Sequence, residues 1–238
     1  SNEVDTKRSP LGGFEPGDIV GVRSADGVLL GSAYMEPQAL ICARLYAPAE
    51  GQTLSTGLFY QRLETALAGR DAVFTQPFYR LVYGDSDLLP GVVIDRFGPY
   101  LVVQLNNAGI ERHRQPLLEA LQKLLSPEGI LLRGDSRSRR ESGLAEDSEV
   151  VLGSVPDQVP LEENGVRFLA PVHAGQKTGW FYWAAKSGHA QKVLAEGLTD
   201  EIIKWRSLEV FEKLSNSPNA KLIFTDGSAP MLLNEDLK

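Results

Sequence analysis

The chain has 238 residues, of which 42% are hydrophobic and 23% charged, the composition of an ordinary globular protein with one large domain or two small ones. Its net charge of -7 and pI near 5.1 exclude a protein that coats nucleic acid non-specifically, so any RNA contact requires a local basic patch. One cysteine excludes a disulfide framework and favours a cytoplasmic location, and no apolar run is long enough to span a membrane.

The first part of the chain predicts short strands joined by turns. Ala25-Asp26-Gly27 has the composition of a hairpin turn between two alternating segments. Such short strands cannot bury a face alone, so they predict a small β-barrel-like module. A helical period follows over residues 56–69 and completes a first domain at residues 1–72. Strands are expected at residues 19–23, 28–34 and 40–46.

The second part, residues 73–170, predicts an α+β domain with an antiparallel sheet and one helix across it. Gly98-Pro99 marks a hairpin turn, and Ser126-Pro127 ends the leucine-rich helix. Asn164-Gly165 marks a second hairpin near the end. Strands are expected at residues 79–83, 91–97, 100–105, 129–133 and 166–169, and the helix at residues 117–125.

The last part, residues 171–238, is expected to be mostly helical. Helices are predicted at Ala184–Glu196 and Glu201–Leu214, before a strand at Lys221–Phe224. The second helix places Ile202, Trp205, Leu208 and Phe211 on one side. The fold class predicted for the whole chain is therefore α+β: a small barrel, an antiparallel-sheet domain and a short helical segment.

Two segments carry a resemblance to a known family. The block Phe78–Gly98, with its Asp-Arg-Phe-Gly end, and the later Gly175–Phe181 resemble the bacterial 23S rRNA cytosine-C5 methyltransferases. The resemblance covers about residues 1–181. It implies an N-terminal PUA domain, a central α+β domain and a Rossmann-like methyltransferase domain, with S-adenosylmethionine (SAM) as cofactor and ribosomal RNA as partner.

The chain departs from this family after Phe181. A cofactor domain would open with a glycine-rich turn between a strand and a helix, and none occurs between Trp183 and Lys238. We therefore expect a truncated or replaced methyltransferase domain, no bound SAM, and a role as the RNA-docking portion of the enzyme, inactive alone. Residues 184–234 resemble the C-terminal tail of prohibitin and stomatin-type proteins. The alternative is a non-catalytic interaction protein that assembles, including as a homo-oligomer, through its amphipathic helix.

Two groups of residues are candidates for binding. Arginines near glycine and serine can grip phosphates and stack on unpaired bases, and the competing interpretation is a solvated loop neutralised by Asp135 and Glu141. The resemblance places a second group at the edge of a SAM pocket, and the competing interpretation is a turn with an exposed lysine. The RNA candidates are Arg133, Arg137, Arg139 and Arg140, and the SAM candidates are Lys177, Thr178 and Gly179.

No catalytic residue or metal site is predicted. Methylation at C5 of a pyrimidine needs a thiolate, and the one thiol, Cys42, lies on a predicted strand where cysteine behaves as a buried hydrophobe. The histidines at positions 113, 173 and 189 share no metal-ligand spacing. Asp85, Asp87 and Asp95 are interpreted as turn and strand-end residues.

Overall fold

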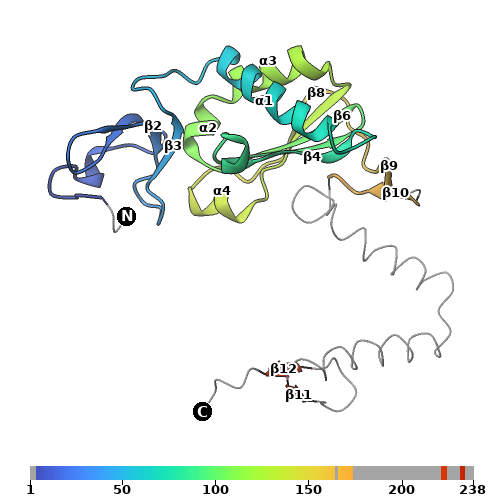
Figure 1. The fold of residues 1–238 in the computed structure, drawn as a ribbon. Helices are drawn as coiled ribbons and strands as arrows, with labels where there is room; N and C mark the ends of the chain where they lie inside the picture. Colours follow the sequence, from blue (N-terminus) through green and yellow to red (C-terminus); the bar gives the residue numbers. More distant parts are fainter. Residues whose placement is uncertain (1–3, 164–165, 174–220, 224–230, 234–238) are drawn as a thin grey trace. The chain divides into compact units, whose positions relative to one another are not determined.

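The computed structural model describes residues 4–163, 166–173, 221–223 and 231–233 (Figure 1). The chain divides into two compact units, Ser1–Tyr182 and Trp183–Lys238. In the second unit, β11 (Lys221–Ile223) pairs antiparallel with β12 (Met231–Leu233), which confirms the strand predicted there. The helices predicted at residues 184–196 and 201–214 lie outside the described residues.

The first unit contains two sheets and a separate β-hairpin. Its elements are η1 (Leu11–Gly13), β1 (Ile19–Arg23), β2 (Leu29–Met35), β3 (Ala43–Ala47), α1 (Thr56–Asp71), β4 (Phe78–Tyr83), η2 (Gly84–Asp87), β5 (Val92–Phe97), β6 (Tyr100–Leu105), α2 (Ala108–Arg112), α3 (Arg114–Leu125), β7 (Gly129–Leu132), α4 (Arg137–Glu141), β8 (Glu149–Gly153), β9 (Val159–Glu163) and β10 (Val166–Ala170).

The N-terminal module is an antiparallel sheet in the order β1-β2-β3. The hairpin predicted at Asp26-Gly27 joins β1 to β2, and Gly27 takes a positive φ of 83° that favours glycine. The third strand begins later than predicted because residues before it form a turn, in which the Glu36 amide donates to the Cys42 carbonyl. The described strands of this module form a three-stranded sheet.

The second sheet has the order β4-β5-β6-β7-β8 and confirms the predicted α+β domain. Three neighbouring pairs are antiparallel as expected, including the β5–β6 hairpin at Gly98-Pro99. β6 and β7 are parallel, with Tyr100 opposite Gly129. This pairing differs from the prediction because α2 and α3 connect the two strands, and a helical crossover returns the chain in the same direction.

Helices α1 and α3 cover one face of this sheet, which we call the helix face (Figure 1). Ser55 caps α1 by accepting a hydrogen bond from the Leu58 amide at 3.3 Å. Although the prediction grouped α1 with the N-terminal domain, it packs against α3 and β4. Buried residues of this layer include Phe59, Leu63, Leu81, Ile94, Leu101, Val103, Leu117, Leu121 and Ile130.

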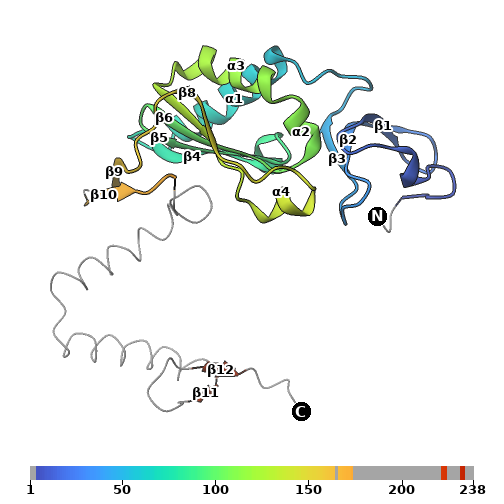
Figure 2. The same ribbon diagram turned by 180° about the vertical axis from the view of Figure 1, so that it is seen from behind.

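The opposite face of the sheet, which we call the open face, is partly covered by the β9–β10 hairpin (Figure 2). β10 pairs antiparallel with β9, which confirms the strand predicted at residues 166–169, and the turn predicted at Asn164-Gly165 lies outside the described residues. Sheet and hairpin share a second apolar cluster, whose buried members are Phe97, Val102, Leu131, Val155, Val159, Leu161, Ala170 and Val172. The strand order therefore leaves the other end of this face to polar residues.

The N-terminal module contacts the central domain through a buried seam. The Tyr34 hydroxyl donates to the Pro90 carbonyl, and the Asn107 amide lies 3.4 Å from that hydroxyl. The Glu36 carboxylate accepts a hydrogen bond from the Ala108 amide at the start of α2. Burial raises the pKa of both Tyr34 and Glu36. Gly109 is needed here because a Cβ would stand 2.3 Å from the Tyr34 ring.

Candidate nucleic-acid interface

The predicted basic segment, residues 133–140, follows β7 and so lies at the carboxyl ends of the parallel strands β6 and β7. Its second half forms α4, whose N-cap Ser136 accepts a hydrogen bond from the Arg139 amide. The Ser136 hydroxyl donates to Asn106 at 2.6 Å, which ties the start of α4 to the end of β6. The segment therefore includes a short helix, while the pairs Arg133–Asp135 and Arg137–Glu141 agree with the neutralisation that the competing interpretation expects.

Two of the four predicted RNA-binding arginines are buried. Arg133 donates to the Val172 carbonyl at 2.7 Å and to the Asp135 carboxylate at 2.9 Å. Arg139 donates to the carbonyls of Leu105 and Ala145 and to the Glu111 carboxylate. Since buried guanidinium groups must be hydrogen-bonded, these two arginines hold the segment in place.

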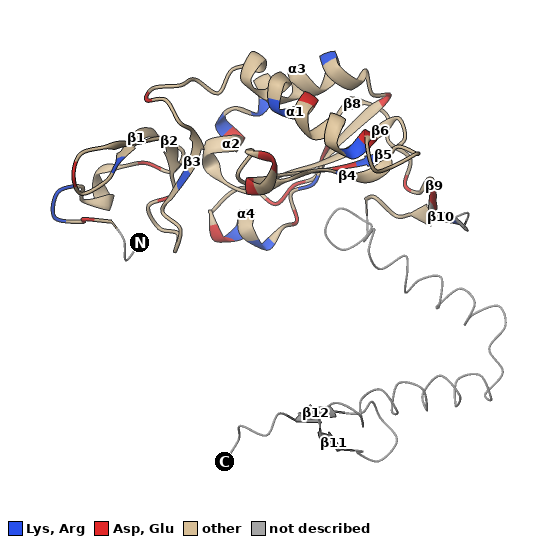
Figure 3. Cartoon of the chain, in the orientation of Figure 1, with Lys and Arg blue, Asp and Glu red and all other residues tan. Residues whose placement is uncertain are grey.

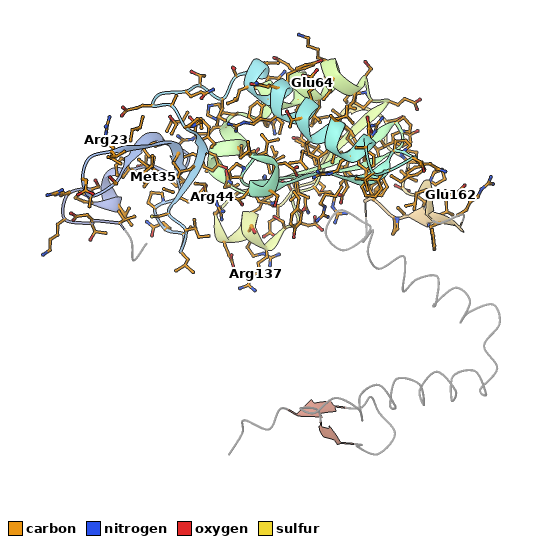
Figure 4. The ribbon with its side chains drawn as sticks, in the orientation of Figure 1. Arg23, Met35, Arg44, Glu64, Arg137 and Glu162 are labelled. Atoms are coloured by element: carbon orange, nitrogen blue, oxygen red, sulfur yellow. The ribbon has the colours of Figure 1, made fainter. Side chains whose placement is uncertain are left out.

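The other two predicted arginines are exposed. The Arg137 side chain is 87% exposed and pairs with Glu141 one turn later. The Arg140 side chain is 64% exposed and pairs with Glu146, whose pKa is lowered by that hydrogen bond. Figure 4 shows Arg137 extending away from α4. Exposed ion pairs of this kind are weak, so both cations can exchange their carboxylate for a phosphate.

A small hollow of about 260 Å³, open to solvent, lies behind α4. Three arginines and three acidic residues line it, so their formal charges cancel. Acidic residues also alternate with basic ones along the nearby elements (Figure 3). The hollow is therefore not an anion site by charge. Its charged residues are Arg114, Arg133, Arg139, Glu111, Asp147 and Glu149.

The remaining sequence candidates are the cysteine, the histidines and the predicted SAM-edge residues. Cys42 is buried directly before β3, which confirms the prediction of a buried hydrophobe. Nδ1 of His113 lies 2.8 Å from the Gly109 carbonyl, and Nε2 of His173 lies 3.0 Å from the Val155 carbonyl. Within the described residues, no cluster of three metal-ligating side chains occurs. The predicted SAM-edge residues Lys177, Thr178 and Gly179 lie outside the described residues.

The interpretation of Asp95 as a strand-end residue was wrong. It lies inside β5, is fully buried and accepts two hydrogen bonds from Arg80, at 2.9 and 3.0 Å. The interpretation as a turn residue holds for Asp87, which ends η2 and accepts hydrogen bonds from the Tyr83 amide and from Arg70. Only the register of β4 against β5 places Arg80 opposite Asp95, and that register is not readable from spacing.

Sequence reasoning also missed a row of residues on the open face. Tyr83, at the end of β4, is opposite Val93 of β5, and Val93 is opposite Gln104 of β6. Tyr83 is 59% exposed, with the Arg80 guanidinium 5.2 Å from its ring centre. Gln104 is buried, and among the described residues its Nε2 atom has no hydrogen-bond partner. Buried donors without an acceptor are rare in proteins, so the Gln104 amide makes this row a candidate binding site.

Comparison with known proteins agrees with this architecture. Residues 1–48 match the model of a PUA-like domain. The N-terminal module is PUA-like. The α+β fold with this module also resembles a protein from Streptococcus mutans assigned as a SAM-dependent methyltransferase, with a TM-score of 0.61, 21% identity and coverage of 73% of this chain and 45% of that one. A methyltransferase structure in complex with SAH gives the same TM-score and identity.

Curated relatives share more sequence. Ribosomal RNA large subunit methyltransferase I from Pseudoalteromonas atlantica is 35% identical over 176 residues, covering 73% of this chain and 45% of the relative. The protein of the same name from Tolumonas auensis is 37% identical over 186 residues, covering 76% of this chain and 46% of the relative. The chain thus spans about half the length of these relatives. The matches lend no support to the prohibitin-type resemblance of residues 184–234, which stays a prediction.

Proposed function

We propose that residues 4–163 and 166–173 of this chain dock ribosomal RNA for a SAM-dependent methyltransferase acting on C5 of a cytosine in 23S rRNA. The relatives named as rRNA methyltransferases and the PUA-like module support this proposal. The observation that carries it is the difference in burial among the arginines of the basic segment, residues 133–140. Arg133 and Arg139 anchor α4 from inside, and Arg137 and Arg140 present their charges to solvent.

The geometry suits phosphate contacts rather than catalysis. Guanidinium groups on an anchored helix lose little conformational freedom when they meet a phosphate, and each phosphate contact releases condensed counterions. Because the net charge of -7 repels phosphate, RNA can approach α4 only where Arg137 and Arg140 exchange their carboxylate partners for phosphates. Ribosomal RNA as partner implies a cytoplasmic chain. Among the described residues, no helix is both long and apolar enough to cross a membrane.

We propose that this chain does not transfer the methyl group by itself. C5 methylation requires a thiolate that attacks the ring, and the only thiol of the sequence, Cys42, is buried against the N-terminal sheet. SAM is the cofactor of the proposed enzyme, but no contact of this chain with SAM is part of the proposal. Transfer of a labelled methyl group from SAM to rRNA by the purified 238-residue chain would refute this statement.

The docking role is tested by filter binding to a 23S rRNA fragment over a range of salt concentrations. The double variant Arg137→Ala/Arg140→Ala should bind more weakly. Its plot of log affinity against log salt should lose a slope of about 0.7–0.9 for each phosphate contact removed. Arg167→Ala is the matched control, since Arg167 on β10 is 91% exposed and has only a 3.9 Å ion pair with Glu162. Equal affinity and slope for the double variant and wild type would remove α4 from the RNA interface.

A further inference from the structure

Three side chains, Tyr83, Val93 and Gln104, lie in one row across the open face. In a regular strand, side chains three residues apart point to opposite faces. The bulge of β4 between Arg80 and Val82 adds one residue, Leu81, and so brings Arg80 and Tyr83 to the same face. Leu81 and Val82 both point into the core on the helix face.

The resulting row joins three different chemical groups. Tyr83 offers an exposed ring, Val93 a half-buried apolar contact and Gln104 a buried amide. Since neighbouring strands lie almost 5 Å apart, the row is about 10 Å long between the Cα atoms of its ends. An aromatic face, an apolar floor and a hydrogen-bond donor within that span match one flat heteroaromatic ring with a polar edge.

The Gln104 amide is the second, independent observation. Its Nε2 atom is buried and has no partner in the part of the chain that the structure describes, which costs about 1–3 kcal/mol of folding free energy for a typical buried donor. A protein keeps such a donor without an acceptor where an acceptor arrives from outside. Carbonyl oxygens and ring nitrogens on base edges are acceptors of this kind.

The phosphate-binding residues lie next to this row. Asn106, two residues after Gln104, accepts the hydrogen bond of Ser136 that anchors α4. The neighbouring Leu105 carbonyl accepts from Arg139. A strand of RNA with its phosphates at Arg137 and Arg140 therefore has a base-sized surface within reach.

We infer that Tyr83, Val93 and Gln104 bind one unpaired nucleotide of single-stranded RNA. The base stacks on the free side of the Tyr83 ring, opposite Arg80, and an acceptor on its edge receives the hydrogen bond of Gln104 Nε2. Duplex RNA does not bind this way, because its bases are stacked on each other and paired. This inference rests on the proposed RNA-docking role and names the form of RNA that the site recognises.

The test uses the full chain and a fluorescein-labelled ten-nucleotide oligouridylate, with binding followed by fluorescence anisotropy. Tyr83→Leu should weaken binding by about 5- to 150-fold, the range that corresponds to loss of one base–aromatic stack. Tyr83→Phe keeps the ring and should stay within about twofold of wild type. Tyr60→Leu is the matched control, because Tyr60 on α1 also has a cation 5.2 Å from its ring, that of Lys123.

Gln104→Leu separates binding from folding. It should weaken oligouridylate binding by about 2- to 13-fold, the loss of one hydrogen bond, while the urea midpoint of the protein stays equal or rises. A structural role for Gln104 would instead lower the midpoint.

The outcomes also distinguish this inference from the docking proposal. If wild-type chain binds neither the rRNA fragment nor oligouridylate, both fail. If wild type binds and the Arg137→Ala/Arg140→Ala variant weakens, but Tyr83→Leu binds oligouridylate as wild type does, only the nucleotide site is refuted. An equal loss of affinity in Tyr83→Leu and Tyr83→Phe would also refute it. So would an equal loss of affinity of Tyr83→Leu for oligouridylate and for an RNA hairpin.

Discussion

Arg139 and Arg137 lie two positions apart in one basic helix, and the structure predicts very different costs for replacing them. The Arg139 guanidinium donates hydrogen bonds to the carbonyls of Leu105 and Ala145 at 2.7 to 2.9 Å and to the Glu111 carboxylate at 2.5 Å. Arg139→Met keeps the aliphatic stem and leaves these acceptors without a donor. Breaking a buried charged network of this kind costs about 3–5 kcal/mol. Arg137→Met removes only an exposed pair with Glu141, worth about 0.3–0.5 kcal/mol.

Urea unfolding followed by far-UV circular dichroism measures both costs. With an m-value of about 2 kcal/mol/M, Arg139→Met should lower the midpoint by about 1.5–2.5 M, and Arg137→Met by about 0.2 M or less. Arg139→Lys restores the charge but not the fork of donors, so its midpoint should lie between Arg139→Met and wild type. Equal, small shifts of the urea midpoint in Arg137→Met and Arg139→Met would show that the Arg139 guanidinium does not anchor α4. The distinction between anchoring arginines and RNA-contacting arginines would then be wrong.

Two further predictions concern the seam between the modules and its surroundings. Gly109→Ala should destabilise the protein by at least about 1–3 kcal/mol, because its Cβ would stand 2.3 Å from the Tyr34 ring. Gly69→Ala in α1 has open space and should stabilise by about 0.5–1 kcal/mol. Thermal unfolding of both variants decides, and a Gly109→Ala variant as stable as wild type would contradict the seam geometry. Burial raises the pKa of Glu36 above its ordinary value of 4.5, so folding favours the protonated form. The stability of the wild type should therefore fall relative to that of Glu36→Gln as the pH rises from about 4 through the raised pKa. Unfolding free energies of the two proteins that stay parallel from about pH 4 to about pH 8 would be inconsistent with a raised pKa.

Local signals in the sequence were sufficient for most elements of the first unit. Asp26-Gly27 and Gly98-Pro99 lie at tight turns, and the strands around them pair as hairpins. The helix that ends before Ser126-Pro127 does so with Ser126 at a φ of 44°. These features depend on residues within a few positions of each other, where turn chemistry and hydrophobic period act directly.

Features that depend on distant residues were not predictable in the same way. The parallel pairing of β6 and β7 follows from where α3 packs, and nothing in either strand's composition encodes a direction. Arg133 and Arg139 look like Arg137 and Arg140 in sequence, since all four lie among serines and acidic residues. They differ because two distant carbonyls accept hydrogen bonds from the first pair: Leu105, 34 positions from Arg139, and Val172, 39 positions from Arg133. Burial that depends on contacts between residues more than 25 positions apart in the sequence is not visible in the local spacing of residue types.

The bulge in β4 shows why the proposed nucleotide site needed the structure. Arg80 and Tyr83 are three residues apart, so strict alternation places the ring on the helix face, beneath α1, where an exposed tyrosine would have no role. The extra residue at Leu81 reverses the direction of Tyr83 while keeping Leu81 and Val82 in the core. A bulge locally disrupts the ladder of hydrogen bonds, and proteins retain bulges where they re-aim a functional side chain. Deleting Leu81 should therefore turn Tyr83 inward and weaken both oligouridylate binding and folding stability, whereas Tyr83→Leu should weaken binding alone, by about 5- to 150-fold. The ring's exposure of 59% makes that second variant the decisive one, because its fold has almost nothing to lose.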